Sequence, residues 1–324
     1  MKSLIICLMG PTASGKTPLA MELVQHFPME IISVDSVMVY RGMDIGTAKP
    51  SPAELTLAPH RLIDFLDPIE HYSAGQFQKD ALQAIESIIA NKKIPLLVGG
   101  TMLYFRVLQQ GIAPLPIRDE ALRQELQQRA EREGWEALHR WLSEMDEEAS
   151  HRIHPHDSQR IQRALEVCLL TGKPLSHLQK EATTVLENYQ VLTIAMAPFE
   201  RERLHQRIAA RFQRMLSQGF VEEVESLYQR GDLHAQLPSI RAVGYRQAWD
   251  YLEGLITKEE MHANILAATR QLAKRQLTWL RSWPEQVPSD ANKEGKLKWY
   301  DSETHRLTET VIRDLEQVVS HFRG

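Results

Sequence analysis

The chain has 324 residues, of which 43% are hydrophobic and 25% are charged, and its formal net charge is −4. This length supports one large domain with an insertion, or two domains. No apolar run approaches the roughly 20 residues that a membrane-spanning helix needs, so we do not expect an integral membrane protein. The slightly negative charge argues against massive nonspecific nucleic-acid binding but is compatible with a local basic face.

The two cysteines, Cys7 and Cys168, each lie in an apolar segment, which favours small core residues over a disulfide or a metal site. A reducing, cytoplasmic location fits this pattern best. The apolar run at residues 4–9 leads into a glycine-rich motif instead of a small-residue cleavage site. We therefore interpret it as a buried strand and not as a signal peptide.

A phosphate-binding motif follows this first apolar run. The segment GPTASGKT fits the pattern G-x-x-x-x-G-K-[ST]. In such a loop the backbone N–H groups face a polyphosphate, the lysine adds a positive charge, and the threonine hydroxyl ligates Mg²⁺. The spacing does not name the ligand, for which ATP is the default. The candidate phosphate-binding residues are Gly10, Pro11, Thr12, Ala13, Ser14, Gly15, Lys16 and Thr17, and the candidate metal ligand is Thr17.

Four short apolar runs predict buried parallel strands, at residues 4–9, 30–34, 94–98 and 191–195. Helical stretches separate these runs, and the alternation is typical of a sheet with helices on both faces. We therefore predict an α/β fold, a P-loop NTPase-like parallel sheet flanked by helices.

The interval between the third and fourth runs is too long for a single crossover helix. We predict a separate helical insertion domain at residues 115–187, with periodic apolar positions and many acidic residues on a solvated face. The catalytic core then comprises residues 1–114 and 188–324. Its C-terminal part is expected to be mostly helical.

Polar side chains follow the second and third predicted strands. Asp35, in SVDS, falls at the carboxyl edge of the sheet, where open α/β folds bind ligands. It is a base, a magnesium ligand or, with equal weight, a helix N-cap. Thr101 in GGTMLYF offers a hydroxyl at the same edge or caps the next helix. Gly99 and Gly100 stand where many P-loop ATPases carry an aspartate, which is a clue against ATP.

A stripe of arginines is predicted on the helix after the fourth strand. Arg203, Arg207, Arg211 and Arg214 are spaced four, four and three residues apart, beside an apolar stripe with the same spacing. Arginines arranged in this way can bind a pyrophosphate or an RNA backbone. The alternative is a solvated face paired with glutamates, which the few nearby acidic residues disfavour.

A second basic segment, TRQLAKRQLTWLR at 269–281, contains no acidic residue. Its cations fall in one arc of a helical wheel and its apolar residues in the other. Together with SQRIQR in the insertion and SIRAVGYRQ at 239–247, it predicts an RNA-binding channel with aromatic stacking.

Six segments, in chain order, resemble the successive motifs of the bacterial tRNA dimethylallyltransferases. They are GPTASGKT, SVDSVMVYRGMDIGTAKP, PLLVGGTMLYF, DSQRIQRALEV, LPSIRAVGYRQ and RQLAKRQLTWLR, and they span nearly the whole chain. The resemblance implies transfer of a dimethylallyl group from dimethylallyl diphosphate to N6 of the adenosine that is 3′-adjacent to the anticodon. The P-loop would then hold an isoprenoid diphosphate with Mg²⁺ as the cofactor.

The resemblance also implies roles for particular residues. Lys16 and Arg211 would neutralise the leaving diphosphate, Asp35 would accept the proton of the amine, and Thr101 would lie between donor and base. The partners would be the tRNA anticodon stem-loop and dimethylallyl diphosphate, with no membrane and a monomeric protein. The implied tRNA-binding residues are Asp35, Ser36, Val37, Met38, Thr101, Arg123, Gln159, Arg160, Ile161, Gln162, Arg163, Arg241, Ala242, Val243, Gly244, Tyr245, Arg246, Lys274, Arg275 and Arg281.

Three other functions share parts of this pattern. A P-loop small-molecule or nucleotide kinase would not need the basic helices, and a prenyltransferase acting on free AMP would dispense with much of the insertion. A nucleic-acid-stimulated NTPase is disfavoured by the missing acidic residue after the third strand. Pro18 departs from the family pattern, in which we expect an ordinary helix former, but a first helical turn tolerates proline.

Overall fold

The computed structural model describes residues 2–283 and 297–320. The chain forms two compact units, one of Met1–Val107 with Leu186–Gly324 and the other of Leu108–Val185. Each unit is described separately below. Within the described ranges no helix is both long and apolar enough to cross a membrane.

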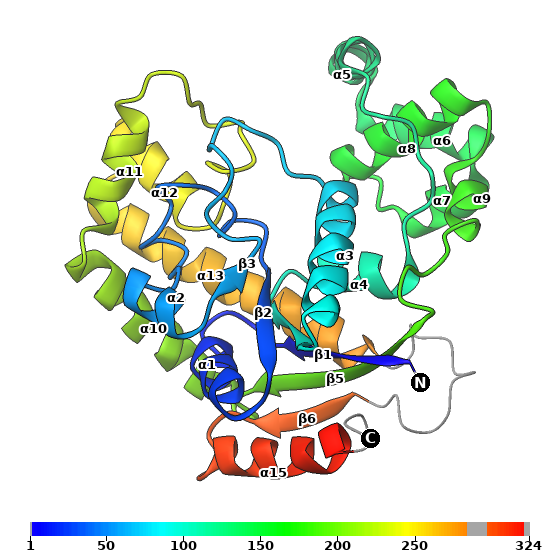
Figure 1. Cartoon of the computed structure of the whole chain (residues 1–324). Coiled ribbons are helices and arrows are strands. Elements are labelled where there is room, and N and C mark those ends of the chain that lie inside the picture. The colour runs from blue at the N-terminus through cyan, green and yellow to red at the C-terminus, as the bar shows by residue number, and fades with distance from the viewer. Residues whose placement is uncertain (1, 284–296, 321–324) are drawn as a thin grey trace. The chain divides into compact units, whose positions relative to one another are not determined.

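A parallel sheet, with six strands among the described residues, forms the centre of the first unit (Figure 1). In spatial order its strands are β3 (His60–Arg61), β2 (Met29–Val34), β4 (Ile94–Gly99), β1 (Ser3–Met9), β5 (Tyr189–Ala197) and β6 (Lys298–Asp301). The four strands predicted from apolar runs are confirmed. The sequence did not predict β3 and β6, because a two-residue strand and the mixed segment KWYD carry no apolar run.

The alternation of strand side chains determines which helices cover each face of the sheet. Leu4, Ile6 and Leu8 of β1 belong to one core cluster with α1 (Lys16–His26) and α15 (Leu307–Ser320). The buried residues between them point to the opposite face. Figure 1 shows α3 (Ala74–Ala90) on the side of the sheet opposite α15. The sheet is therefore covered on both faces, as its apolar strands require.

A second core lies beyond the carboxyl edge of the sheet. It joins the segment after β2, through the buried Val39, Tyr40 and Met43, to buried residues such as Phe220 and Tyr245 on the C-terminal helices. The remaining helices of this unit are α2 (Pro52–Leu57), α4 (Met102–Gln110, which ends at the second unit), α10 (Arg201–Ser217), α11 (Phe220–Tyr228), α12 (Tyr245–Leu252) and α13 (Lys258–Arg281).

The second unit is helical. Its helices are α5 (Glu120–Glu133), α6 (Trp135–Met145), α7 (Glu147–Arg152), α8 (Ser158–Thr171) and α9 (Leu175–Lys180). Leu126, Leu138, Leu142, Ile161 and Leu165 form the centre of its own hydrophobic core. This unit spans residues 108–185, whereas the insertion was expected at 115–187, so the unit begins seven residues earlier and ends two residues earlier.

Candidate active site

The P-loop connects β1 to α1 at the carboxyl edge of the sheet. Gly15, at the N-cap of α1, has φ 92° and ψ 18°, a left-handed conformation that glycine adopts without a steric penalty. A Cβ on Gly10 would overlap the carbonyl oxygen of Met196 on β5. No side chain caps α1, so its N-terminal N–H groups can bind an anion. Pro18 lies in this first turn, where a missing N–H costs little.

Two cations lie together in this loop region. Lys16 Nζ donates to the carbonyl oxygen of Pro11 at 2.7 Å. Burial and then the charge of Arg211 lower the pKa of Lys16 to about 7, against the opposing effect of Asp35. Burial also lowers the pKa of Arg211, an effect that Asp35 opposes and Arg214 reinforces. A bound anion would relieve the repulsion between the two cations.

Two arginines of α10, a helix in the C-terminal part of the chain, bind the P-loop. Arg211 donates through Nη1 to Thr12 Oγ1 and through Nη2 to the carbonyl oxygen of Thr47, both at 3.0 Å. Arg207 donates to the carbonyl oxygen of Ser14 at 3.1 Å. It also pairs with Glu303 and donates to the hydroxyl and the carbonyl oxygen of Ser302, near β6. The arginine stripe thus connects the P-loop to two other segments.

The ends of β2 and β4 form the opposite wall. Asp35 Oδ1 accepts the backbone N–H groups of Val37 and Met38, at 2.9 and 3.1 Å, and therefore caps a turn and not a helix. Thr101 Oγ1 accepts the backbone N–H of Ser36 at 3.1 Å. The Thr101 hydroxyl therefore ties two strand ends together at the rim of the sheet.

These walls enclose a cavity of about 1050 Å³. It is lined by the P-loop, Asp35, the loop at residues 44–50, Gly99 and Gly100, three α10 arginines (Arg207, Arg211 and Arg214), residues 242–245, and Leu272 and Gln276 of α13. The volume lies at the upper end of ordinary ligand pockets. The cavity therefore has room for a phosphate-bearing ligand at the loop and a second group near Asp35.

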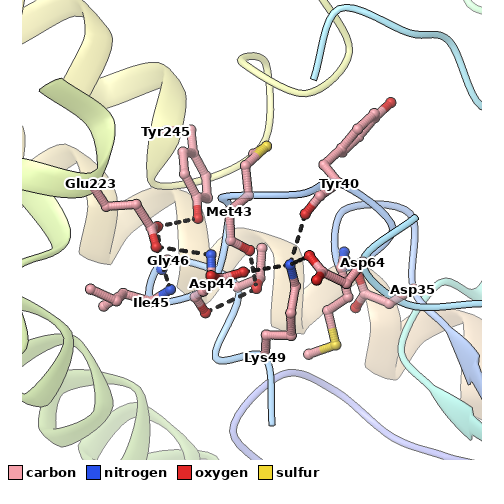
Figure 2. A network of polar contacts seen from close by, with 12 residues as sticks. Asp35, Tyr40, Met43, Asp44, Ile45, Gly46, Lys49, Asp64, Glu223 and Tyr245 are labelled. Carbon is pink, nitrogen blue, oxygen red and sulfur yellow. Dashed lines mark hydrogen bonds and ion pairs between the residues drawn. The ribbon is translucent and has the colours of Figure 1, made fainter. Parts of the chain in front are cut away.

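The loop at residues 44–49 is held by a carboxylate, as Figure 2 shows. Glu223 on α11 accepts the backbone N–H groups of Asp44, Ile45 and Gly46, at 2.9, 2.7 and 3.1 Å. The Tyr245 hydroxyl donates to the same carboxylate at 2.6 Å. Three successive N–H groups facing one carboxylate form an anion-binding nest. Glu223 therefore fixes the loop whose next residue, Thr47, accepts from Arg211.

Lys49 closes the other end of this loop. Its side chain is only 4% exposed, and Nζ contacts Asp44 and Asp64 carboxylates at 2.5 and 2.7 Å. It also donates to the carbonyl oxygen of Tyr40 at 2.7 Å (Figure 2). A buried ammonium with three oxygen partners is fully satisfied, so Lys49 is a structural cation in this structure.

The proposed RNA-contact residues of the first unit differ in exposure. Tyr245 is fully buried with its hydroxyl on Glu223, so its ring is not presented for stacking on a base. Arg246 is engaged by Asp250. Exposed cations are Arg241, Lys274, Arg275 and Arg281; partly exposed residues are Ser36, Val37, Met38, Ala242 and Val243; Gly244 is buried and lines the cavity. Their contact with RNA stays a prediction.

In the second unit, the predicted residues gather around a buried acid. Glu166, which is 0% exposed, pairs with Arg123 at 3.1 Å and with Arg163 at 2.7 Å. Gln162 Nε2 donates to the carbonyl oxygen of Arg123. Ile161 lies in the core, whereas Gln159 and Arg160 are exposed. The direct-contact candidates here are thus the exposed pair, while Glu166 fixes the orientation of the two paired arginines.

The donor set of the cavity fits a magnesium ion held mainly by a ligand's phosphates. Thr17 and Asp35 place a hydroxyl and a carboxylate on its walls. In the described parts of the chain no group of three or more His, Cys, Asp or Glu side chains could hold a metal by itself. Mg²⁺ commonly binds through one or two protein oxygens, substrate phosphates and water, so this sparse set is adequate.

Sequence reasoning missed Glu223, Gln276 and Lys49 as site residues. Glu223 lies in FVEEVESLY and has the spacing of an ordinary surface glutamate, while Gln276 lies among the cations of the second basic segment. The only available signal was that Lys49 lies in SVDSVMVYRGMDIGTAKP, one of the six segments that carry the resemblance.

Fold and site together define an α/β protein in which the glycine-rich loop between β1 and α1 lines a large cavity. A family model described as IPP transferase matches residues 38–283. The tRNA dimethylallyltransferase 2 of Hahella chejuensis is 52% identical over 325 residues, which cover 96% of this chain and 95% of that protein. The chain therefore belongs to the IPP transferase family.

Solved structures show the same relationship. The tRNA isopentenylpyrophosphate transferase of Bacillus halodurans is 36% identical, with a TM-score of 0.68 over 99% of this chain and 96% of that one. A eukaryotic dimethylallyltransferase acting on tRNA has a TM-score of 0.80 over 98% of this chain and 80% of that one, at 24% identity. This second similarity establishes the shared fold.

The lowered pKa of Lys16 predicts a pH-dependent affinity for diphosphate. Below pH 7 the lysine is charged; above it the free protein must take up a proton to charge the lysine when the anion binds. The Kd for inorganic diphosphate at fixed Mg²⁺ should therefore rise by up to about tenfold per pH unit above 7. Isothermal titration calorimetry measures it. In Lys16→Met the Kd should vary with pH only through the titration of diphosphate itself. If the plots of log Kd against pH were parallel for the two proteins, Lys16 would not be the titrating group.

Replacing Glu223 should loosen the loop at residues 44–49. Glu223→Gln turns one acceptor into an NH₂ group facing backbone N–H donors, which should lower the free energy of unfolding by about 1–3 kcal/mol. It should also weaken diphosphate binding, because Thr47 positions Arg211. Urea unfolding and calorimetry measure the two effects. The matched control is Glu222→Gln, which removes the same charge from the exposed neighbour; equal effects of both variants would argue against the loop contact.

Proposed function

We propose that this protein transfers a dimethylallyl group from dimethylallyl diphosphate to N6 of the adenosine that is 3′-adjacent to the anticodon of tRNA, releasing diphosphate. The observation that carries the proposal is a cavity with the glycine-rich loop after β1 on one wall and, on the other, Asp35, whose neighbour Ser36 is bound by Thr101. The printed names of relatives support it, since the Hahella chejuensis protein is a tRNA dimethylallyltransferase.

The diphosphate would bind at the P-loop. Lys16, the N-terminal N–H groups of α1 and Arg211 would stabilise the negative charge that grows as the allylic carbon–oxygen bond breaks. Thr17 would hold Mg²⁺ together with the substrate phosphates. When bound, the ion supplies further neutralisation of the departing diphosphate.

The amine would bind at the opposite wall. The new bond joins N6 of adenosine to C1 of the allyl group, the C1–O bond to diphosphate breaks, and N6 loses one proton. Asp35 would accept that proton, because its carboxylate faces the cavity and is oriented by two N–H groups on Oδ1. Thr101 would order this wall through Ser36. A weakly nucleophilic amine needs such positioning.

The acceptor must be an unstacked base. A cavity of about 1050 Å³ can take a flipped adenine together with an isoprenoid, whereas a base inside a stacked loop could not reach the P-loop. The exposed Lys274, Arg275 and Arg281 on α13 and Arg241 would bind the RNA backbone. We further propose that Gln159 and Arg160 of the second unit contact the anticodon stem-loop, and that the protein acts as a monomer in the cytoplasm.

A radiolabel transfer assay tests the reaction and the acceptor together. With labelled dimethylallyl diphosphate, we expect label in unmodified tRNA, none in free AMP, and loss of transfer when Mg²⁺ is chelated. Label in AMP would move the protein to the free-nucleotide prenyltransferases. Consumption of ATP without label transfer would favour a P-loop kinase.

Removing the proposed base should separate catalysis from binding. Asp35→Ala should lower kcat by at least about 100-fold, the scale of general-base catalysis, while the Kd for tRNA changes little. Single-turnover label transfer and filter binding measure the two quantities. Glu316→Ala is the control, because it removes an exposed carboxylate of α15 that does not line the cavity. Near-parental turnover by Asp35→Ala would contradict the assignment.

A further inference from the structure

One side chain joins the two walls of the cavity. Gln276 on α13 accepts the backbone N–H of Thr12 through Oε1 at 2.9 Å. Its Nε2 donates to the carbonyl oxygen of Gly100 at 2.8 Å. Thr12 belongs to the P-loop and Gly100 precedes Thr101, so a single amide spans from the phosphate side to the acceptor side.

The chemistry of the two contacts determines which way the amide faces. Thr12 offers an N–H and needs an acceptor, while Gly100 offers a carbonyl oxygen and needs a donor. A side-chain amide supplies both from neighbouring atoms without charge. A Cβ on Gly100 would meet Nε2, so the absence of a side chain there permits this approach. Glutamate would add charge, and methionine would make neither bond.

The helix holds Gln276 rigidly. Ala273 and Leu280, one turn before and one turn after it, are buried at 1% and 0% exposure. Ala273 packs in one cluster with Leu204 and Ile208 of α10, the helix that carries Arg211. Packing between the two helices therefore fixes the backbone at Gln276, and the two hydrogen bonds orient its amide.

Both ends of the amide lie next to groups with proposed roles. Arg211 donates to the hydroxyl of Thr12, whose N–H is bound by Gln276. On the other side Thr101, the residue after Gly100, binds Ser36 beside Asp35. A change in the amide would alter the separation of the diphosphate and acceptor walls, and reacting groups tolerate little misplacement.

We propose that Gln276 is a positioning residue that sets the distance between the diphosphate-binding loop and the acceptor edge. This inference rests on the proposed prenyl transfer. Gln276 acts through Thr12 and Gly100 and takes no proton. Its neighbours Lys274 and Arg275 are exposed on the same helix, so RNA binding and wall spacing use different faces of α13.

The first test uses Gln276→Met, which keeps the length of the side chain and removes both hydrogen bonds. With both substrates saturating, the single-turnover rate of label transfer should fall about 10- to 100-fold, while the Kd for tRNA stays within about twofold. The control is Gln206→Met, the same change at an exposed position of α10 that does not line the cavity, which should keep the parental rate. A parental rate for Gln276→Met would overturn the proposal.

The second test uses pH to restore the missing donor. In Gln276→Glu the ionised carboxylate repels the carbonyl oxygen of Gly100 and the diphosphate, whereas the protonated form again donates to Gly100 and accepts from Thr12. The ratio of the variant's rate to the parental rate should therefore rise as the pH falls from about 8 to about 6, toward the range where carboxyl groups protonate. A merely structural role predicts a constant ratio.

The outcomes also separate this inference from the proposed function. If the parental protein transfers no label to tRNA, the proposed function fails and the spacing role fails with it. If the parental protein is active and Gln276→Met matches it with a flat pH ratio for Gln276→Glu, the spacing role alone fails. Circular dichroism melting of each variant identifies loss of folding, and a rate loss that follows only from the unfolded fraction would also overturn the role.

Discussion

The burial of two cations beside one another is the constraint on which the site depends. Lys16 and Arg211 lie in the same wall, and burial lowers the pKa of both groups. Asp35 offsets part of this cost, but the arrangement favours an anion as the third member. A net-negative protein has thus placed its positive charge where a diphosphate would gain most from it.

Hydrogen bonds from side chains to backbone groups hold the wall that carries Lys16 and Arg211. Arg211 binds the Thr47 carbonyl, Glu223 binds the N–H groups just before it, and Gln276 binds the N–H of Thr12. Each contact joins elements that are distant in sequence. Helices α10, α11 and α13 therefore hold the P-loop and the loop at residues 44–49 in place, and the walls of the cavity come from separate parts of the chain.

The sequence predicted the features that depend on local pattern. The apolar runs identified β1, β2, β4 and β5, and the glycine spacing identified the loop, because strand burial and tight turns leave signals within a few residues. Contacts such as Glu223 with Asp44, or Gln276 with Thr12, join residues more than 170 positions apart. Side-chain chemistry permits such pairs but does not select them. Tyr245 illustrates the limit, since its motif suggested stacking on RNA and the fold buries it.

The arginine stripe of α10 shows what periodicity can and cannot specify. A spacing of four, four and three keeps all four side chains within one narrow arc of the helix. Position along the axis is a separate matter, because each residue advances about 1.5 Å, so Arg203 begins roughly 12 Å from Arg211. Arg203 pairs with Glu200, while Arg207, Arg211 and Arg214 line the cavity. The spacing predicts which face of α10 carries the arginines, and the packing of α10 against α13 determines which of them line the cavity.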